Sequence, residues 1–269
     1  MAPTFGMSLE ENLSLQDTYG IGFVQGVPIT PEVTLTHKNL PLKATQKLAQ
    51  RIAFIRETHY GGFWDFTSNL AHGDTAYTTL ALAAHTDTTY FTDPVGLQGF
   101  HLLSHTNGSG GKSLFVDGFQ VAQSLLERHP WAFDILSKIR LQAHSAGDAS
   151  ILYKAFPPSG HPILNLDPQT RELYQIRFNN DDRSPLKTAD PPSFYAALRE
   201  WTSLLQSRDH ELWVQLQPGT FVLFNNWRVL HGRSGFSGKR RLVGCYIGMD
   251  DFASRVRMIV DAGREKRVL

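Results

Sequence analysis

The sequence alternates short apolar runs with turn-forming residues, and this spacing limits the folds open to it. Strand-like runs lie at Ala81–Ala84, Gly96–Leu103, Ser113–Val116, Leu173–Phe178, Leu212–Leu216, Phe221–Asn225 and Arg241–Ile247. Turn signals such as Asn107-Gly108 and Pro218-Gly219 separate several of these runs. Because the runs do not alternate regularly with helices, the pattern predicts a jelly-roll or barrel core with helices on its outside.

Four segments have the apolar spacing or the start signals of helices. We predict helices over residues 42–58, from the candidate N-cap Asp117 to Ile139, from Asp190-Pro191-Pro192 onward, and over the last twenty residues. Pro130 is expected to divide the second of these. Residues 61–75 are rich in Gly, Ser, Asn and Asp, so a loop is predicted there. The predicted fold class is therefore mainly β with flanking helices.

The composition fits one folded domain spanning residues 1–269. Hydrophobic residues make up 41% of the chain, which is enough to form a core. Lys and Arg (26) nearly balance Asp and Glu (25), so no overall positive charge favours a nucleic-acid partner. The longest apolar runs are far shorter than the roughly 18 residues of a membrane span. A membrane partner is therefore not expected either.

Cysteine content and the first residues bear on the cellular compartment. The single cysteine, Cys245, excludes intramolecular disulfides and fits a reducing compartment. The first residues lack the basic start and apolar stretch of a signal peptide. They contain Glu10, Glu11 and Asp17 but no basic residue, unlike a mitochondrial presequence. A cytoplasmic localisation is therefore expected.

Two histidines and one aspartate have the pattern of a metal site. His85 and Asp87 follow an apolar run and lie two residues apart, so on a strand both would point to one face. His231 ends a second strand-like run and is the distal candidate. Two imidazoles and one carboxylate on one side of a metal leave the opposite positions open, an arrangement suited to non-haem Fe(II) and O2.

A second pair in the chain has the same spacing. His72 and Asp74 also form a His-x-Asp sequence. They lie in the Gly-, Ser- and Asn-rich segment with no strand before them, so their relative geometry would be poorly fixed. We therefore favour His85 and Asp87 as the ligand pair.

An arginine and a serine could complete a site for a dicarboxylic co-substrate. Arg240 follows His231 at the start of another strand-like run, and its planar guanidinium suits a bidentate carboxylate partner. Its neighbour Arg241 would face the other way, because Arg240 and Tyr246 share a strand face. Ser113 offers a hydroxyl beside flexible glycines. Taken singly, Arg240 could instead end a surface strand and Ser113 could merely fill a turn.

Longer segments resemble a known family. They are YGGFW, GDTAYTTLALAAHTDTTYF, GGKSLFVDGF, YQIRFNNDDR, NNWRVLHGR and RRLVGCYI. In order and spacing they resemble the trimethyllysine dioxygenase and γ-butyrobetaine hydroxylase family of Fe(II)- and 2-oxoglutarate-dependent oxygenases, and the trimethyllysine branch more nearly. The resemblance covers about residues 20 to 260 and implies a double-stranded β-helix (jelly-roll) core. It also implies the cofactors Fe(II), 2-oxoglutarate and O2, with ascorbate as the reductant.

The resemblance assigns roles residue by residue. The iron ligands fall on His85, Asp87 and His231, the arginine for the distal carboxylate of 2-oxoglutarate on Arg240, and its helper hydroxyl on Ser113. The substrate residues fall on Tyr60, Trp64, Tyr77 and Tyr246 as an aromatic cage, on Asp74, and on Asn179 at the substrate's polar end. A trimethylammonium group donates no N–H hydrogen bond, so aromatic faces would hold it by cation–π attraction. These aromatic residues could equally belong to an ordinary core.

The resemblance implies an enzyme that oxidises an aliphatic C–H bond of a small amino-acid or betaine substrate, with 3-hydroxylation of N6-trimethyllysine first. The family's extra N-terminal domain, which takes part in dimerisation, is not expected in this chain, and a homodimer is left open. Because that domain also positions the substrate, an oxygenase of another small amino acid in a biosynthetic pathway is the alternative. Its outcome would be hydroxylation, desaturation or cyclisation. A non-catalytic metal-binding β-helix protein is the more remote alternative.

Overall fold

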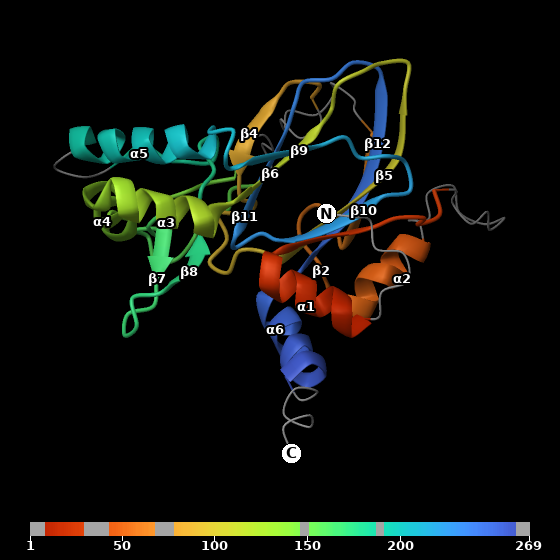
Figure 1. Ribbon diagram of the computed structural model, residues 1–269, viewed down its shortest axis with the longest axis horizontal. Helices are drawn as coiled ribbons and strands as arrows, with labels where there is room; N and C mark the ends of the chain where they lie inside the picture. Colours follow the sequence, from red (N-terminus) through yellow and green to blue (C-terminus); the bar gives the residue numbers. More distant parts are fainter. Residues whose placement is uncertain (1–8, 30–42, 68–77, 146–150, 187–190, 262–269) are drawn as a thin grey trace.

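The computed structural model describes residues 9–29, 43–67, 78–145, 151–186 and 191–261. Two antiparallel sheets form its centre (Figure 1). The larger sheet has the order β1 (Ile21–Val24), β10 (Phe221–Asn225), β5 (Leu97–Thr106), β12 (Lys239–Ile247) and β2 (Ile55–Arg56), and β3 (Phe63–Thr67) also pairs with β12. The smaller sheet has the order β4 (Leu82–His85), β11 (Val229–Arg233), β6 (Ser113–Asp117) and β9 (Glu211–Val214).

Aromatic side chains from the two sheets pack against each other. Phe115 of β6 contacts Phe224 of β10 with ring centroids 5.5 Å apart, and Phe23 of β1 with centroids 5.9 Å apart. Apolar residues of both sheets surround these rings, including Leu102 and Val229. The mainly β fold with flanking helices is confirmed. Within the described residues the strands form two facing sheets, as in a jelly roll, and not a closed barrel.

Helices cover two sides of this core. α3 (Gly118–Arg128), α4 (Pro130–Lys138) and α5 (Pro191–Leu205) stack beside the smaller sheet and the hairpin of β7 (Leu164–Leu166) and β8 (Leu173–Ile176) (Figure 1). α1 (Leu9–Tyr19), α2 (Lys43–Ile52), α6 (Met249–Val256) and the π-helical turn Arg257–Asp261 pack at one end of the larger sheet. No helix in the described ranges has the length and apolarity to cross a membrane.

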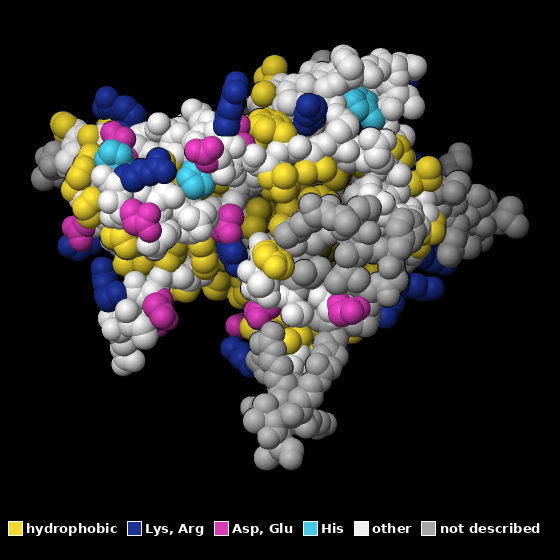
Figure 2. All heavy atoms as spheres, viewed as in Figure 1, with side chains coloured by type: hydrophobic (Ala, Val, Ile, Leu, Met, Phe, Trp, Pro, Cys, Tyr) yellow, Lys and Arg dark blue, Asp and Glu magenta, His cyan; other side chains and the backbone are white. Residues whose placement is uncertain are grey.

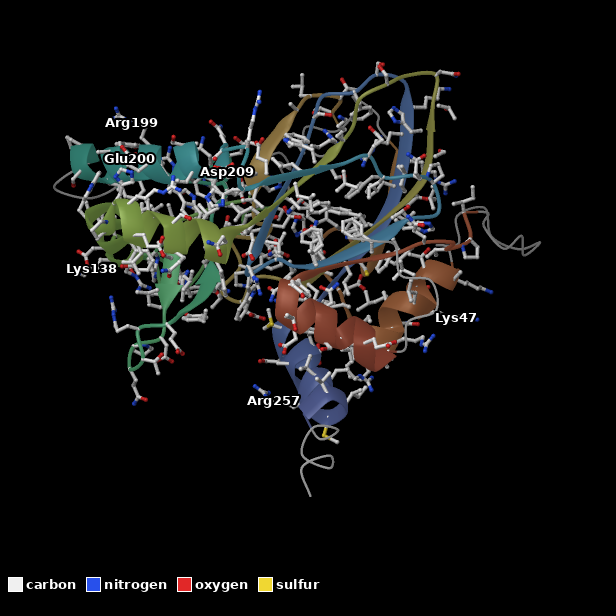
Figure 3. All side chains as sticks on the ribbon, viewed as in Figure 1. Lys47, Lys138, Arg199, Glu200, Asp209 and Arg257 are labelled. Carbon is white, nitrogen blue, oxygen red and sulfur yellow. The ribbon has the colours of Figure 1, made fainter. Side chains whose placement is uncertain are left out.

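The surface of the helical layer is mixed in charge. In Figure 2, acidic and basic side chains are interspersed over this face of the molecule and do not gather by sign. Figure 3 shows Lys138 of α4 and Arg199 of α5 extending outward. Inward, Phe194 and Trp201 of α5 are fully buried. The helices therefore present one apolar side to the core and one charged side to solvent, as amphipathic helices do.

The predicted starts of three helices are confirmed. The Asp117 carboxylate accepts hydrogen bonds from the backbone N–H groups of Phe119 and Gln120, so it caps α3. Pro130 stands at the first position of α4, where its missing N–H costs nothing. α5 likewise begins at Pro191.

The predictions for residues 42–75 were partly wrong. The helix ends at Ile52, not at residue 58, because Ile55 and Arg56 pair with Ile247 and Tyr246 of β12. The predicted loop contains the strand β3, whose residues pair with β12 from Arg241 to Cys245. A long-range partner strand thus overrides the local loop-forming composition. Residues 68–75 lie outside the described ranges.

Candidate active site

The register of two strands places His85 beside His231. β4 and β11 run antiparallel with these two residues as direct partners. Their ring centroids lie 4.4 Å apart. Cross-strand neighbours on one face are close by geometry. The strand pairing therefore brings together two imidazoles from distant parts of the sequence.

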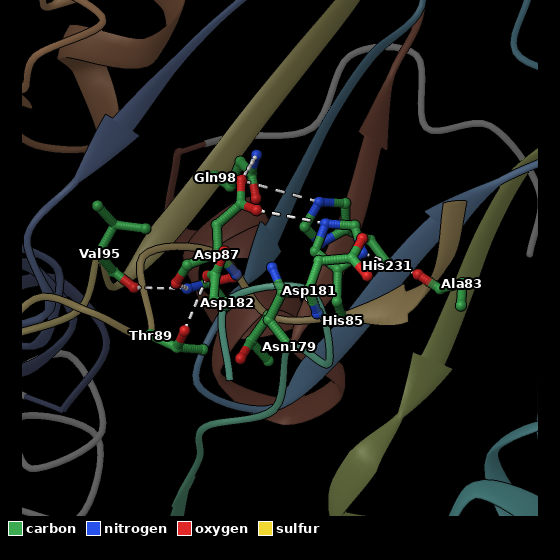
Figure 4. A network of polar contacts seen from close by, with 12 residues as sticks. Ala83, His85, Asp87, Thr89, Val95, Gln98, Asn179, Asp181, Asp182 and His231 are labelled. Atoms are coloured by element: carbon green, nitrogen blue, oxygen red, sulfur yellow. Dashed lines mark hydrogen bonds and ion pairs between the residues drawn. The ribbon is translucent and has the colours of Figure 1, made fainter. Parts of the chain in front are cut away.

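Asp87 reaches the histidines by a different route from the one predicted. β4 ends at His85, so Asp87 lies beyond the strand and strand alternation does not place it. Asn226 holds it in place: its Oδ1 accepts from the Asp87 N–H at 2.8 Å, and its Nδ2 donates to the Asp87 carbonyl at 3.0 Å and to the Val95 carbonyl at 3.0 Å. Thr88 then takes a left-handed φ of 56°. The Asp87 carboxylate points at both imidazoles (Figure 4).

The three side chains fit a metal ion. One potential ligand atom from each lies within 4.8 Å of the others. The Asp87 Oδ1 is 3.3 Å from His85 Nε2, and its Oδ2 is 3.9 Å from His231 Nε2. Nδ1 of His85 lies 2.8 Å from the Ala83 carbonyl, which can only accept. Nδ1 therefore carries the proton and Nε2 presents its lone pair, the arrangement found in metal-ligating histidines.

Electrostatics favours the ligating forms of Asp87 and His231. Burial raises the pKa of Asp87, but His231 and His85 lower it further, so the net shift is downward. Burial is the largest of the effects that lower the pKa of His231 to about 3. At neutral pH the carboxylate is therefore ionised and this imidazole neutral. Those are the forms that bind a metal ion.

Two residues of the larger sheet fix the Asp87 carboxylate. Gln98 of β5 donates to Oδ2 at 2.6 Å, and the Tyr246 hydroxyl donates to the same oxygen at 2.9 Å. Such outer partners orient a metal-ligating carboxylate. Sequence reasoning did not identify Gln98 or Asn226, because no local motif signals that either side chain contacts Asp87.

The three residues open into a cavity of about 490 Å³ between the sheets. Arg240, with 9% of its surface exposed, and Ser113 both line this cavity. Burial lowers the pKa of Arg240 to about 10, and the positive charge of the neighbouring Arg233 contributes to this shift. Arg240 therefore remains a cation at neutral pH. Arg241 instead pairs with Asp65 on the outside. The bulge between β12 and β5 places its extra residue, Leu103, on β5. Side chains along β12 therefore still alternate between the two faces, and Arg240 and Tyr246 share one face.

A second arginine lies in the same cavity. Arg233 follows His231 by two residues on β11, so it shares its strand face. Its guanidinium donates to the carbonyls of Thr78 (2.8 Å) and Leu80 (3.0 Å). The Phe236 ring lies 4.9 Å from the Arg233 guanidinium and 5.8 Å from that of Arg240. The i, i+2 spacing after His231 was the signal that could have found Arg233.

The substrate residues predicted from the resemblance are placed as follows. Tyr60, Tyr246 and Asn179 line the cavity. Trp64 is 4% exposed and packs against Tyr246 with ring centroids 5.7 Å apart, and it is not among the lining residues. Phe66, which was not predicted, lines the cavity in front of it. Asp74 and Tyr77, and the rival pair His72 and Asp74, lie outside the described residues.

The sequence is that of a family of dioxygenases. Residues 8–246 match the sequence model of the family described as "Taurine catabolism dioxygenase TauD, TfdA family", and the chain belongs to this family. Among solved structures of the same fold are asparagine oxygenase (TM-score 0.67, 15% identity, 90% of this chain and 78% of that one) and the non-heme iron oxygenase OrfP in complex with Fe and α-ketoglutaric acid (TM-score 0.66, 16% identity, 92% and 81%).

Within the family, the resemblance to the trimethyllysine dioxygenases and their γ-butyrobetaine relatives is confirmed. The chain is 48% identical to trimethyllysine dioxygenase of Neurospora crassa in an alignment 248 residues long, which covers 79% of this chain and 52% of that protein. It is 46% identical to the mitochondrial trimethyllysine dioxygenase of Rattus norvegicus (90% and 55%) and 35% identical to human gamma-butyrobetaine dioxygenase (79% and 56%). The chain spans about half the length of these relatives.

Proposed function

We propose that this chain is an Fe(II)- and 2-oxoglutarate-dependent oxygenase that hydroxylates an aliphatic C–H bond of an amino acid. The first candidate substrate is N6-trimethyllysine, hydroxylated at C3. The observation that carries the proposal is the convergence of His85, Asp87 and His231 at the floor of the cavity. The similarity to trimethyllysine dioxygenases supports the choice of substrate. When bound, iron with 2-oxoglutarate and O2 supplies the oxidative decarboxylation to succinate and CO2 and the hydroxylation.

The residues around the metal ligands divide the remaining tasks. Arg240 and Ser113 bind the distal carboxylate of 2-oxoglutarate, because both face the cavity and the guanidinium fork matches a carboxylate. Gln98 and Tyr246 hold the Asp87 carboxylate in its ligating orientation. Burial between the sheets limits the access of water to these groups, which strengthens each charged contact.

The aromatic wall supports a cationic substrate. Tyr60, Phe66 and Tyr246 present rings to the cavity, and such rings attract a quaternary ammonium group. Trp64 contributes by fixing the position of Tyr246 from behind. Asp74 and Tyr77 complete the proposed substrate set. Asn179 binds the substrate's polar end.

The test of the oxygenase is substrate-dependent succinate formation with iron, ascorbate and 2-oxoglutarate. His231→Ala should abolish it, because one of the three ligands is lost. His129→Ala, in the helical layer far from the cavity, is the matched control and should retain activity. Undiminished turnover in His231→Ala would overturn the assignment.

A competition assay separates the substrate candidates. Trimethyllysine, γ-butyrobetaine and the aliphatic amino acids are mixed in equal amounts, and the products are read by mass spectrometry. We expect oxidised trimethyllysine to dominate. A dominant product from another amino acid would favour the alternative of a biosynthetic oxygenase. If no compound in the mixture supports oxygen consumption, a non-catalytic binding protein is favoured.

We propose a cytoplasmic location as well. The one cysteine, Cys245, is buried as a free thiol, which fits a reducing compartment. Fractionation of cells that express the full-length protein tests this, and recovery in the mitochondrial fraction would contradict it.

A further inference from the structure

A second carboxylate lies in the cavity beside the metal ligands. Asp182 follows Asn179 in the loop after β8, lines the cavity and is 8% exposed. Figure 4 shows its side chain next to Asp87 and Thr89. Its Oδ2 accepts a hydrogen bond from the Thr89 hydroxyl at 2.9 Å. Its backbone carbonyl accepts from the His144 N–H at 2.9 Å, which fixes the loop.

This carboxylate has no lysine or arginine partner in the described part of the chain. Its one hydrogen bond among these residues comes from the neutral hydroxyl of Thr89, and no Lys or Arg of the described ranges forms an ion pair with it. Burial raises its pKa to about 7 and the charge of Asp87 acts in the same direction, whereas the Thr89 hydrogen bond and His85 oppose the shift. A buried carboxylate without a counter-ion is costly. A cation brought by a ligand would remove that cost.

The neighbouring amide has the opposite character. The side-chain amide oxygen of Asn179, Oδ1, accepts a hydrogen bond from the Asp181 N–H at 3.0 Å. The amide NH2 group of this side chain is left to donate into the cavity. An amide NH2 donates and suits a carboxylate, whereas Asp182 accepts and suits an ammonium. One loop therefore presents a donor and an anionic acceptor side by side, which matches the zwitterionic end of an α-amino acid.

We propose that Asp182 binds the α-ammonium group of the substrate while Asn179 binds its α-carboxylate. The inference rests on the proposed oxygenase function and refines its substrate class. The substrate would be an α-amino acid with a free ammonium group. A betaine such as γ-butyrobetaine, which lacks that group, would leave Asp182 unpaired. Asp182 would thus separate trimethyllysine from its desamino analogues.

The test compares two ligands that differ only in the α-ammonium group. N6-trimethyllysine and 6-(trimethylammonio)hexanoate are titrated calorimetrically into the protein with Fe(II) and 2-oxoglutarate, without O2. We expect the wild type to prefer trimethyllysine by about tenfold or more, the usual scale for a charge-assisted contact. Asp182→Asn should weaken the binding of trimethyllysine by about the same factor and change the affinity for the analogue less than twofold. Asp209→Asn, an exposed carboxylate after α5 (Figure 3), is the control for net charge.

Two results would overturn the inference. A wild type that binds both ligands equally has no ammonium site, whatever the variants do. Equal weakening of both ligands in Asp182→Asn would mean that Asp182 acts through Thr89 on the metal ligands. Succinate formation by the wild type is scored separately. If trimethyllysine is turned over but its preferential binding does not depend on Asp182, the oxygenase function is supported and the ammonium site is rejected. If the preference depends on Asp182 but no succinate forms, the ammonium site is supported and the oxygenase function is rejected.

Discussion

The Tyr246 hydroxyl donates to the Asp87 carboxylate across 2.9 Å, from the larger sheet to the loop that follows β4. This contact gives Tyr246 a role other than that of an aromatic wall alone. Burial raises the pKa of Tyr246 well above its usual value, and the charge of Asp87 adds to the shift. The phenol therefore keeps its proton and remains a donor to the carboxylate.

Tyr246→Phe should weaken Fe(II) or Mn(II) binding by about tenfold, because it removes one of the two donors that orient Asp87. The aromatic ring is retained, so the cavity wall is unchanged. Metal titration under anaerobic conditions measures the effect. Tyr174→Phe, which alters an exposed tyrosine on β8, serves as the control. Unaltered metal affinity in Tyr246→Phe would show that Gln98 alone fixes the carboxylate.

Arg240→Ala should raise the apparent KM for 2-oxoglutarate by about a hundredfold, which corresponds to about 2–3 kcal/mol for a charge-assisted pair. Arg241→Ala should have little effect, because Arg241 pairs with Asp65 at the surface. Initial rates over a range of 2-oxoglutarate concentrations distinguish the two variants. A larger effect in Arg241→Ala would contradict the placement of the co-substrate.

Asn226→Ala should lower both the stability and the metal affinity of the protein. It removes three hydrogen bonds at a residue that is 1% exposed and leaves the Asp87 N–H and the Val95 carbonyl without a partner. We expect a loss of about 2–4 kcal/mol in the free energy of unfolding. Urea unfolding and metal titration check the two effects. Retained stability with retained metal binding would rule out the anchoring role of Asn226.

Stability should fall as the pH drops from about 6.5 towards 4, in part through His101. This residue is fully buried, and burial lowers its pKa to about 4, below the unfolded value of 6.5. Between these values the unfolded chain binds the proton and the folded chain does not, so acid favours unfolding. His101→Gln should flatten the dependence in urea titrations at several pH values, whereas His210→Gln should not. An equal slope in His101→Gln would refute the assignment.

The sequence predicted those features that depend on local pattern. The strand Phe221–Asn225 agrees with β10 residue for residue because its apolar run is bounded by turn signals. Asp117 and Pro130 marked helix starts because caps act through neighbouring backbone groups. Residue type and spacing predicted that His85, Asp87 and His231 would come together, and they do. Strand alternation was nevertheless the wrong reason for the position of Asp87.

Features that depend on long-range contacts could not be predicted in this way. β3 is a strand because β12 pairs with it, in spite of its loop-like composition. Trp64 fills the space behind Tyr246, and nothing in its neighbourhood along the chain distinguishes this position from one in the cavity. Asn226, in the turn after β10, reaches Asp87 from 139 residues away along the chain, and Gln98 reaches it from the other sheet, on β5. Their roles require the packing of the two sheets.

The two facing sheets divide the components of the cavity between them. His85, His231 and Ser113 belong to the smaller sheet, whereas Arg240, Gln98 and Tyr246 belong to the larger one. The imidazole pair is therefore complete within one sheet. The orientation of the Asp87 carboxylate, and the site proposed for 2-oxoglutarate between Arg240 and Ser113, form only when the two sheets pack together. Metal affinity and co-substrate affinity should therefore both report on the packing of the two sheets. A chain whose sheets are not packed together would bind a metal ion weakly and would not bind 2-oxoglutarate.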